Sequence, residues 1–506
     1  MKVLLIELPS SREELNEPIG LGTIAGYAQQ HSSVTSLQID FHWSQLGPLT
    51  LSRSALKGYA LIGVSAQIGS LEAFHEIYCN SIAPSGVPTI VGNLIPTYEP
   101  RVLLDRYPEI VCVKGEGELA FAQIIDLIAQ GNEHFKSELA HIPNLVYRTG
   151  DTIATTSNVK TALETIGQVA RPFLPEISRE GGLARIEGSR GCHWGRCEFC
   201  SVAARFGLGS WRPFPVEQVV AQLSELSNCG IRSPYFTDED FFGRDYARAK
   251  ELGEAISSAK RQGRIHSQLN FFISMLASDI RSNECIDALV TLKAAGLREV
   301  FVGVEAGDDV QLRRYKKKAR RGTNTQALEV LSSMGLQIDI GSILFEPHMT
   351  FNELRRNWEF VSGLDLPECD SRVSKRLRIQ PQTGSPLRYF DVIDGPLDPN
   401  TMSFPYNYRD DKVARVWDLY SRWASDFKPT VDVLLAECRG EVESEQHRLA
   451  MKRTLARIRH VDLLALGHVM ESIDRGMQAE LLEYGATMQD LIDAAREMAS
   501  RTPLGA

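Results

Sequence analysis

Residues 189–200 have the sequence Ser189-Arg190-Gly191-Cys192-His193-Trp194-Gly195-Arg196-Cys197-Glu198-Phe199-Cys200. Three of the nine cysteines of the chain fall within this segment: Cys192, Cys197 and Cys200. Thiolates so closely spaced can hold three irons of a cubane iron–sulfur cluster and leave the fourth iron open to another ligand. The segment directly follows a predicted strand, Leu183–Glu187. The sequence therefore predicts a cluster on the loop after that strand.

Zinc is the alternative metal for these thiols, with His193 as a fourth ligand. Zinc modules usually contribute their ligands in two separated pairs, and the sequence shows no second pair. The other six cysteines are scattered, and each is expected to be a small buried hydrophobe: Cys79, Cys112, Cys229, Cys285, Cys369 and Cys438.

The composition narrows the class of protein. A formal net charge of −9 over 506 residues argues against general nucleic-acid binding. No apolar run is long enough to span a bilayer. The start, MKVLLIELPSSREEL, has the pattern of a first strand and not of a signal peptide. We therefore expect a cytoplasmic protein whose thiols are reduced or bound to metal.

Around the cysteine segment, residues 183–390 alternate strands with helices. The later helices close at glycines that directly precede a strand, where a left-handed residue ends a helix well. The strand candidates are Leu183–Glu187, Pro234–Asp238, Gln268–Met275, Glu299–Glu305, Ile338–Phe345 and Ser374–Gln380. Six such units predict a partial (β/α)6 barrel of the TIM type, with its chemistry at the carboxyl ends of the strands.

Three further regions flank this barrel. Residues 1–135 alternate short apolar strands with helices and predict an α/β, doubly wound, Rossmann-like domain with a parallel sheet. Ligands bind such sheets at the carboxyl ends of their strands, where small residues let a ligand approach the backbone. Residues 136–182 are polar and are interpreted as a linker, with a hairpin near residues 148–151. Residues 391–506 predict a helical C-terminal domain.

The cysteine segment resembles the radical S-adenosylmethionine (radical SAM) superfamily, both in its Ser-Arg-Gly-Cys lead-in and in its Cys-Glu-Phe-Cys end. Four residues separate Cys192 from Cys197 where three are usual, a variant found in some members. The resemblance implies a [4Fe–4S] cluster on Cys192, Cys197 and Cys200 that cleaves S-adenosylmethionine reductively. The electron would come from a flavodoxin- or ferredoxin-type donor.

Further barrel positions resemble the S-adenosylmethionine-binding residues of that superfamily. Phe199 matches the aromatic residue whose backbone contacts adenine. Asp238 and Glu239 end the second strand, where acidic groups bind the methionine ammonium by charge-assisted hydrogen bonds; a helix-capping turn is the alternative. Glu305 matches the residue that bonds the ribose hydroxyls. The segments 341–347 and 380–387 resemble the endings of the fifth and sixth strands.

The N-terminal domain resembles the cobalamin-binding subfamily. Residues 91–100, Val-Gly-Asn-Leu-Ile-Pro-Thr-Tyr-Glu-Pro, match its Gly-Gly-x-x-x-Thr-x-x-Pro signature, with Asn93 where a second glycine is common. Residues 114–118, Lys-Gly-Glu-Gly-Glu, match its Gly-Glu-Gly-Glu turn. The Asp-x-His-x-x-Gly motif of classical cobalamin domains is absent, as in many radical members. The resemblance implies that cobalamin lies with its nucleotide tail among these residues: Ser65, Gly92, Thr97 and Gly117.

The activity implied is methyl transfer to an unactivated carbon, or to phosphorus, of a small molecule or natural-product precursor. Rearrangement, cyclisation and carbon–heteroatom bond formation, including transfer of a non-methyl group of S-adenosylmethionine, are the alternatives within the superfamily. A non-catalytic cobalamin or iron–sulfur sensor is the alternative of another class. Methylthio transfer is disfavoured, because it requires three N-terminal cysteines and only Cys79 and Cys112 precede the barrel.

Charged residues near the cluster have two interpretations each. Arg190 and Arg196 flank the cysteines, and they either raise the cluster potential or brace the loop. A basic run at residues 313–321 is interpreted as a solvated helix face. Its alternative is a dock for an anionic substrate or for the electron donor.

Overall fold

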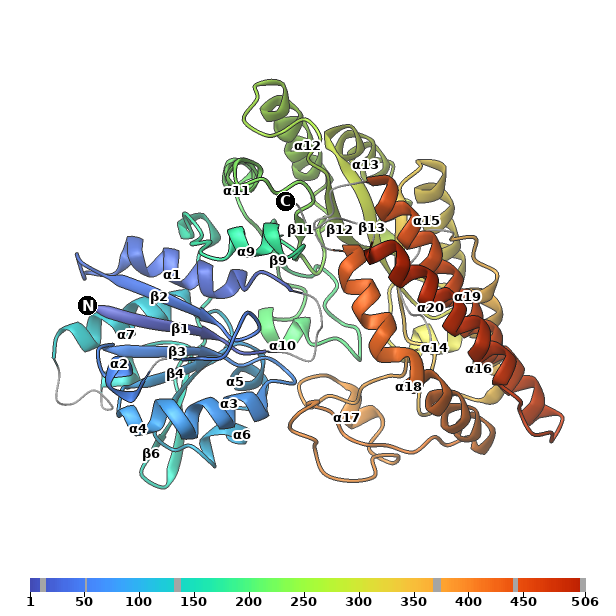
Figure 1. Ribbon diagram of the computed structural model, residues 1–506, viewed down its shortest axis with the longest axis horizontal. Helices are drawn as coiled ribbons and strands as arrows, with labels where there is room; N and C mark the ends of the chain where they lie inside the picture. Colours follow the sequence, from blue (N-terminus) through green and yellow to red (C-terminus); the bar gives the residue numbers. More distant parts are fainter. Residues whose placement is uncertain (10–14, 51, 132–137, 367–374, 440–444, 501–506) are drawn as a thin grey trace.

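The computed structural model describes residues 1–506 except 10–14, 51, 132–137, 367–374, 440–444 and 501–506. In Figure 1 an N-terminal sheet lies on one side, a second parallel sheet lies beside it, and three long C-terminal helices cover the second sheet. Helix α10 (Val202–Phe206) lies between the two sheets. None of the described helices carries an apolar stretch long enough to cross a membrane.

The N-terminal sheet has the strand order β2-β1-β3-β4-β5-β6-β7. Its parallel part comprises β1 (Lys2–Glu7), β2 (Gln38–Trp43), β3 (Leu61–Ser65), β4 (Thr89–Gly92) and β5 (Val111–Val113). Helices α1 (Ile19–His31) and α7 (Glu118–Ala129) belong to the core on one face. The core of the other face holds Phe74 and Leu103, from α3 (Leu71–Ile77) and α6 (Arg101–Leu104). The prediction of a doubly wound α/β domain is confirmed.

The predicted linker at 136–182 is in part a continuation of this sheet. Strands β6 (Leu145–Thr149) and β7 (Thr152–Thr155) form a hairpin, and β6 pairs antiparallel with β5. Leu145, Val146 and Tyr147 are buried. The hairpin predicted near residues 148–151 is confirmed. The pairing of β6 with β5 was not predicted, so the N-terminal sheet extends beyond residue 135.

The second sheet has the order β14-β13-β12-β11-β8 and is parallel throughout. Its strands are β8 (Arg185–Ile186), β11 (Tyr235–Phe236), β12 (Phe271–Leu276), β13 (Leu297–Glu305) and β14 (Gln337–Ser342). The connecting helices are α11 (Val216–Asn228), α12 (Tyr246–Arg261), α13 (Asn283–Ala295) and α15 (Arg321–Ser333), followed by α16 (Phe351–Ser362). Five of the six predicted strands are present, which makes this an open, partial barrel.

The sixth predicted strand, Ser374–Gln380, is reduced to single bridges in its described part. Arg376 pairs in parallel with Phe345, and Ile379 pairs antiparallel with Phe404. Ser374 lies outside the described residues. Pro381 follows this segment and limits a longer ladder, because proline has no amide hydrogen to donate, and Pro386 lies in the first turn of the short helix α17 (Ser385–Arg388).

Three helices form the C-terminal region, as predicted: α18 (Asp411–Arg439), α19 (Glu445–Asp474) and α20 (Leu482–Ser500). Their apolar faces join the main hydrophobic core. Ion pairs fasten them to the barrel, since Lys452 of α19 pairs with Glu299 of β13 and Arg439 of α18 pairs with Asp339 of β14. Both partners lie toward the amino ends of their strands, so these helices cover the end of the barrel away from the cysteine loop.

Candidate functional site

The cysteine loop follows β9 (Ser189–Gly191), which pairs antiparallel with β10 (Trp211–Pro213) in a two-stranded ribbon. The Cys192 amide donates to the Ser210 carbonyl at 2.9 Å. Gly191 has a φ of +93°, and a β-carbon there would overlap the Ser210 carbonyl oxygen. Glycine is required at this position for the ribbon to turn into the loop.

The three cysteines gather in one buried place. Cys192 is buried, and Cys197 and Cys200 are half-buried. Burial raises the pKa of Cys192 to about 12 and that of Cys200 to about 11, and the charge of Cys197 adds to both increases. Buried thiols with raised pKa values need a compensating cationic partner to become thiolates, and bound iron is such a partner.

The three cysteine sulfurs do not form a compact single-ion site in the described part of the chain. Among the described residues, the three cysteine sulfurs do not form a group whose ligand atoms all lie within 4.8 Å of one another; His193, Asp240 and Asp279 do. His193 is held elsewhere, because its Nδ1 contacts Asp240 Oδ2 at 2.6 Å and its Nε2 contacts Lys318 Nζ at 3.2 Å. The geometry therefore does not support a zinc site made of the three cysteines and His193.

His193 instead fastens the loop to the neighbouring strand ends. Asp240, which follows β11, also accepts from the His193 amide at 3.1 Å. Asp279 lies alongside, and burial together with the charge of Asp240 raises its pKa to about 6. With Lys318 on Nε2 and Asp240 on Nδ1, the imidazole has a partner on each nitrogen, which favours a fixed ring orientation.

Four of the seven cations at 313–321 are exposed, as the interpretation of a solvated face requires: Arg313, Lys316, Arg320 and Arg321. The interpretation is wrong for the buried Lys317, and Arg314 and Lys318 are half-buried. Lys317 is buried, and its Nζ lies 3.0 Å from Glu305 Oε1. Arg314 pairs with Glu346 and Glu353, and Lys316 pairs with Glu198. The run follows α14 (Asp309–Arg314) and turns inward over the carboxyl ends of the strands.

Lys317 is a site residue that the sequence analysis missed. Burial alone would lower its pKa, but Glu305, Cys197 and Cys200 raise it above the ordinary value, so it stays charged. The same charge opposes the burial effect on the pKa of both cysteines. Glu305, predicted to bond a ribose, is thus an ion-paired carboxylate with a strained φ of +65° at the end of β13.

The two predicted acids after β11 differ in orientation. Asp238 is turned into the protein, where it accepts from the Gly188 amide at 2.8 Å and from Ser189 Oγ at 2.5 Å. Burial raises its pKa to about 7. Glu239 lines the cavity described below and accepts from the Gly191 amide at 3.3 Å. Of the pair, Glu239 is available to a ligand and Asp238 supports the β8–β9 turn.

A cavity of ≈ 430 Å³ separates the N-terminal sheet from the barrel. The four residues predicted for cobalamin contact all line it: Ser65, Gly92, Thr97 and Gly117. On the barrel side it is bounded by Glu187, Arg190, Thr237 and Glu239, together with Arg205 and Phe206 of α10. Its size lies in the usual range for small-molecule sites, about 300–1,000 Å³.

The N-terminal wall of this cavity includes five glycines among its apolar and polar side chains: Gly20, Gly63, Gly92, Gly115 and Gly117. A β-carbon on Gly92 or Gly115 would meet nothing within 4 Å. Asn93 has a φ of +83°, which explains why glycine is common at its position. Its side chain donates to Ser65 Oγ at 2.8 Å, and Thr97 Oγ1 accepts from the Gly115 amide at 3.0 Å. None of the described lining residues is a histidine.

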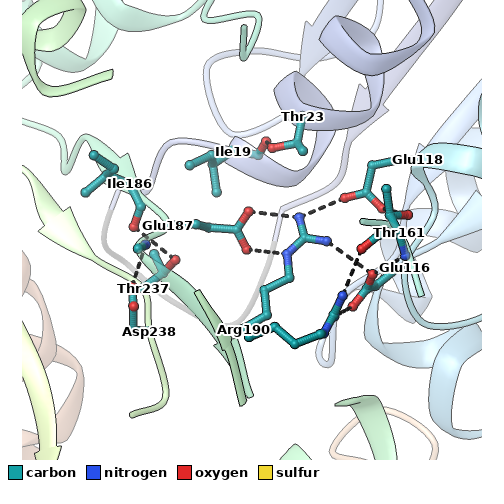
Figure 2. Close-up of polar contacts among 12 residues, drawn as sticks. Ile19, Thr23, Glu116, Glu118, Thr161, Ile186, Glu187, Arg190, Thr237 and Asp238 are labelled. Atoms are coloured by element: carbon teal, nitrogen blue, oxygen red, sulfur yellow. Dashed lines mark hydrogen bonds and ion pairs between the residues drawn. The ribbon is translucent and has the colours of Figure 1, made fainter. Parts of the chain in front are cut away.

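A buried ion network closes the junction between the two sheets (Figure 2). Arg190, just before the cysteines, bonds Glu118 at 2.7 Å and Glu187 at 2.9 Å and approaches Glu116 at 3.6 Å. Arg212 of β10 also pairs with Glu116. Burial by itself would raise the pKa of Glu118. The positive charge of the adjacent Arg190 outweighs this effect, so the pKa of Glu118 lies below its usual value. Of its two interpretations, Arg190 therefore has the bracing role, and the Gly-Glu-Gly-Glu turn is its anchor.

Phe199 and Arg196 complete the loop. The Phe199 ring packs edge-on against Tyr315 at 5.1 Å, so its side chain belongs to a core cluster. Arg196 is exposed and lies 5.5 Å over the Trp194 ring. The fold thus brings the cysteine loop, the buried cation Arg190 and the glycine-lined cavity to the junction between the N-terminal sheet and the barrel.

Comparison with known proteins agrees with this arrangement. Residues 186–355 match the family model described as the radical SAM superfamily. The chain is 28% identical over 327 residues to 4′-phospho-dehydrooxetanocin synthase of Priestia megaterium, covering 60% of this chain and 43% of that protein. It is 28% identical over 262 residues to hopanoid C-3 methylase of Methylococcus capsulatus, covering 50% and 47%. The chain thus spans less than half the length of these two relatives.

Among solved structures, the fold is similar to that of the cobalamin-dependent S-adenosylmethionine radical enzyme OxsB with aqua-cobalamin bound. The TM-score is 0.76 with 18% identity, covering 99% of this chain and 80% of that one. At this identity the likeness concerns the fold alone. It extends over the N-terminal sheet, the partial barrel and the C-terminal helices together.

Proposed function

The barrel of this chain, through residues 186–355, belongs to the radical SAM superfamily, and from that premise we propose a cobalamin-dependent enzyme that cleaves S-adenosylmethionine reductively and methylates a small molecule. The acceptor is an unactivated carbon or a phosphorus atom. The observation that carries the proposal is the glycine-lined cavity, which opens between the Rossmann-like sheet and the residues beside the cysteine loop.

The residues of the chain divide the work between two cofactors. Cys192, Cys197 and Cys200 would hold the [4Fe–4S] cluster, and Ser65, Gly92, Thr97 and Gly117 would line the cobalamin site. When bound, the cluster would supply the electron that breaks a carbon–sulfur bond of S-adenosylmethionine, and the cobalamin would supply methyl transfer. A flavodoxin- or ferredoxin-type protein would be the electron donor.

Charged side chains then orient S-adenosylmethionine. Glu239 accepts hydrogen bonds from its ammonium group, and Glu305 accepts from the ribose. Lys317 holds Glu305 in its strained conformation and keeps a positive charge beside Cys197 and Cys200. Phe199 offers its backbone to adenine while its ring stays in the core. Arg190 fixes the cavity wall relative to the cluster strand.

A second outcome is favoured by one observation. Of the two curated relatives described above, the one that matches over 327 residues is named a synthase. The one that matches over 262 residues is named a methylase. Radical-driven rearrangement without methyl transfer is therefore the alternative activity. Both outcomes use the same cofactor sites and differ in the fate of the methyl group.

The test is anaerobic purification followed by iron, sulfide and cobalt analysis. We expect about four irons and one cobalt per chain, and 5′-deoxyadenosine from S-adenosylmethionine with a strong reductant. With methyl-deuterated S-adenosylmethionine, label appearing on cobalamin supports methyl transfer. Deoxyadenosine without labelled cobalamin supports the alternative. Protein that binds cobalt but forms no 5′-deoxyadenosine would contradict both activities. That result would support a non-catalytic cobalamin sensor.

A cavity-filling variant tests the cobalamin site separately. Gly92→Leu places a side chain where the structure has open space, so the sheet is undisturbed while the cavity is filled. We expect cobalt binding to fall at least about tenfold, equivalent to about 1.4 kcal/mol, with iron content unchanged. Gly322→Leu, in open space on the exposed start of α15, is the matched control and should keep both metals. Equal cobalt in the two variants would place cobalamin elsewhere.

A further inference from the structure

The cysteine loop has one side that faces the N-terminal domain and one that does not. On the Cys200 side, α10 follows directly, packs against α5 (Leu94–Tyr98) and contributes Arg205 and Phe206 to the cavity. On the Cys197 side, the Glu198 amide donates to the Tyr315 carbonyl at 2.9 Å. The Trp194 indole donates to the Lys316 carbonyl, also at 2.9 Å. This second side therefore faces the basic run at 313–321.

Five residues on that side are linked by contacts or are chain neighbours, and we call them the Cys197 patch: Trp194, Arg196, Lys316, Leu387 and Arg388. Lys316 lies 2.7 Å and Arg388 lies 3.6 Å from the two oxygens of Glu198. Arg196 covers the Trp194 ring. Since Glu198 and Arg196 are the chain neighbours of Cys197, the patch is tied to the segment that carries this predicted cluster ligand.

The patch is positively charged on an acidic protein. Two of its three cations, Lys316 and Arg388, pair with one buried carboxylate, Glu198. The Lys316 side chain is 55% exposed and Arg196 is exposed as well. The chain as a whole carries a net charge of −9, so the patch is a local reversal of the overall charge. Such a reversal attracts an acidic partner to one place.

Apolar side chains accompany the charge. Leu387 is 86% exposed and the nearby Phe390 is 74% exposed. Single exposed apolar residues are ordinary. Beside a cluster of cations, however, they supply the apolar contact that a charged rim lacks in a protein interface.

We propose that the Cys197 patch is the docking surface for an acidic one-electron carrier protein that reduces the cluster, which rests on the proposed function. The partner matches the patch in charge and brings its redox group to the side of the loop away from the cobalamin cavity. In the flavin case, the anionic hydroquinone loses one electron and becomes the neutral semiquinone. The [4Fe–4S] cluster gains that electron, and no proton is transferred. The cavity stays free for substrate while the electron arrives.

The experiment uses the full-length, cluster-loaded protein and photoreduced flavodoxin as the probe, in an anaerobic stopped-flow instrument. The variant Arg196→Glu/Lys316→Glu reverses the charge of the patch. Its matched control, Arg53→Glu/Lys57→Glu, makes the same charge change on exposed residues at α2 (Arg53–Leu56). We expect the second-order rate constant for semiquinone formation at low salt to fall about tenfold or more in the patch variant. The control should stay within about twofold.

Added salt should slow the wild type, because screening removes the attraction, and should slightly speed the charge-reversed variant, because screening weakens the repulsion. Leu387→Asp, at a side chain in open solvent, gives a second variant that leaves every ion pair intact and should slow reduction moderately. Equal rates in patch and control variants, or a wild-type rate insensitive to salt, would overturn the docking surface.

Reduced methyl viologen, a small cation, is the reference reductant. It should reduce all variants alike, and equal signals show that each variant holds its cluster. If viologen reduces the wild-type protein and no 5′-deoxyadenosine forms, the proposed function fails independently of docking.

Discussion

The two walls of the central cavity are built on opposite plans. The N-terminal wall consists of strand ends and turns with small residues, such as Gly92, Gly115 and Gly117, where backbone is exposed to a ligand. The barrel wall and the adjoining cysteine loop present buried cations that are paired with acids: Arg190 reaches across to Glu118 of the N-terminal domain, and Lys317 pairs with Glu305 of β13. The N-terminal wall leaves space for a ligand, and the paired charges of the barrel wall hold side chains at fixed positions.

The difference has a physical reason. A large neutral ligand is held by many weak contacts along a surface, so the protein needs space and exposed amide groups more than charge. A reaction that moves an electron needs charges at fixed positions, and buried ion pairs provide them when every partner is present. Changes on the barrel wall should therefore cost more stability than changes on the glycine wall.

The largest effect is expected on removing Arg190. Arg190→Met leaves Glu118 and Glu187 without their buried cation, which costs about 3–5 kcal/mol of folding free energy. Scanning calorimetry should show a lower melting temperature, and limited proteolysis should cut the junction between the two sheets first. Arg179→Met breaks an exposed pair with Glu180 and is the control, at about 0–1 kcal/mol. Similar losses in both variants would remove the contrast between the walls.

A titratable group on the glycine wall gives an intermediate, pH-dependent effect. Burial raises the pKa of Glu7, at the end of β1, to about 7, despite hydrogen bonds from Ser65 and Gln67. The unfolded chain ionises Glu7 near its ordinary pKa of 4.5. The folded state thus binds the extra proton, and stability is lost as pH rises from about 4.5 to 7.

Glu7→Gln removes this penalty. We expect the variant to gain roughly 1–3 kcal/mol over the wild type at pH 8 and little at pH 4, below both pKa values. Melting temperatures measured across that range test it. A gain that is the same at both pH values would show that folding does not raise the pKa of Glu7.

The smallest effect is expected at Asn93. Asn93→Ala loses the hydrogen bond to Ser65 and puts alanine at a φ of +83°, at a cost of about 1–2 kcal/mol. Asn93→Gly loses the same bond but relieves the backbone, so it should cost less. Thermal unfolding of the two variants separates the contributions. A glycine variant less stable than the alanine variant would mean that the backbone is not strained.

Local sequence patterns were sufficient for most of the architecture. The helical face of Val216, Val219, Val220 and Leu223 predicts α11, and it is buried as expected. The cysteine spacing places the loop after the first barrel strand, where it lies. The predicted linker at 136–182 is the exception, because β6 is recognisable as a strand only by its pairing with β5. The prediction of a sixth barrel strand was wrong for a related reason. A strand needs a neighbouring strand to pair with as well as apolar residues, and the described part of this segment forms only single bridges.

The site residues divide in the same way. Cys192, Cys197 and Cys200, and the four small residues of the cavity, are marked by spacing or by residue type. Lys317 carries no such mark, because in sequence it is one of seven cations at residues 313–321. The direction in which each cation points depends on acids up to 118 residues away, as the pair of Lys316 with Glu198 shows. The roles of Asp238 and Glu239 likewise depend on which way each side chain turns at the end of β11.

Two properties of the site can be read from local sequence: three thiols lie on one loop, and glycines end strands of the N-terminal sheet. Both depend on backbone conformation and on neighbours a few residues apart. Three others appear only in the folded chain: Arg190 joins the cysteine strand to the Gly-Glu-Gly-Glu turn, Lys317 faces Glu305, and a cavity lies between the N-terminal sheet and the barrel. Buried charges are stable only with partners, and folding brings those partners from distant parts of the chain.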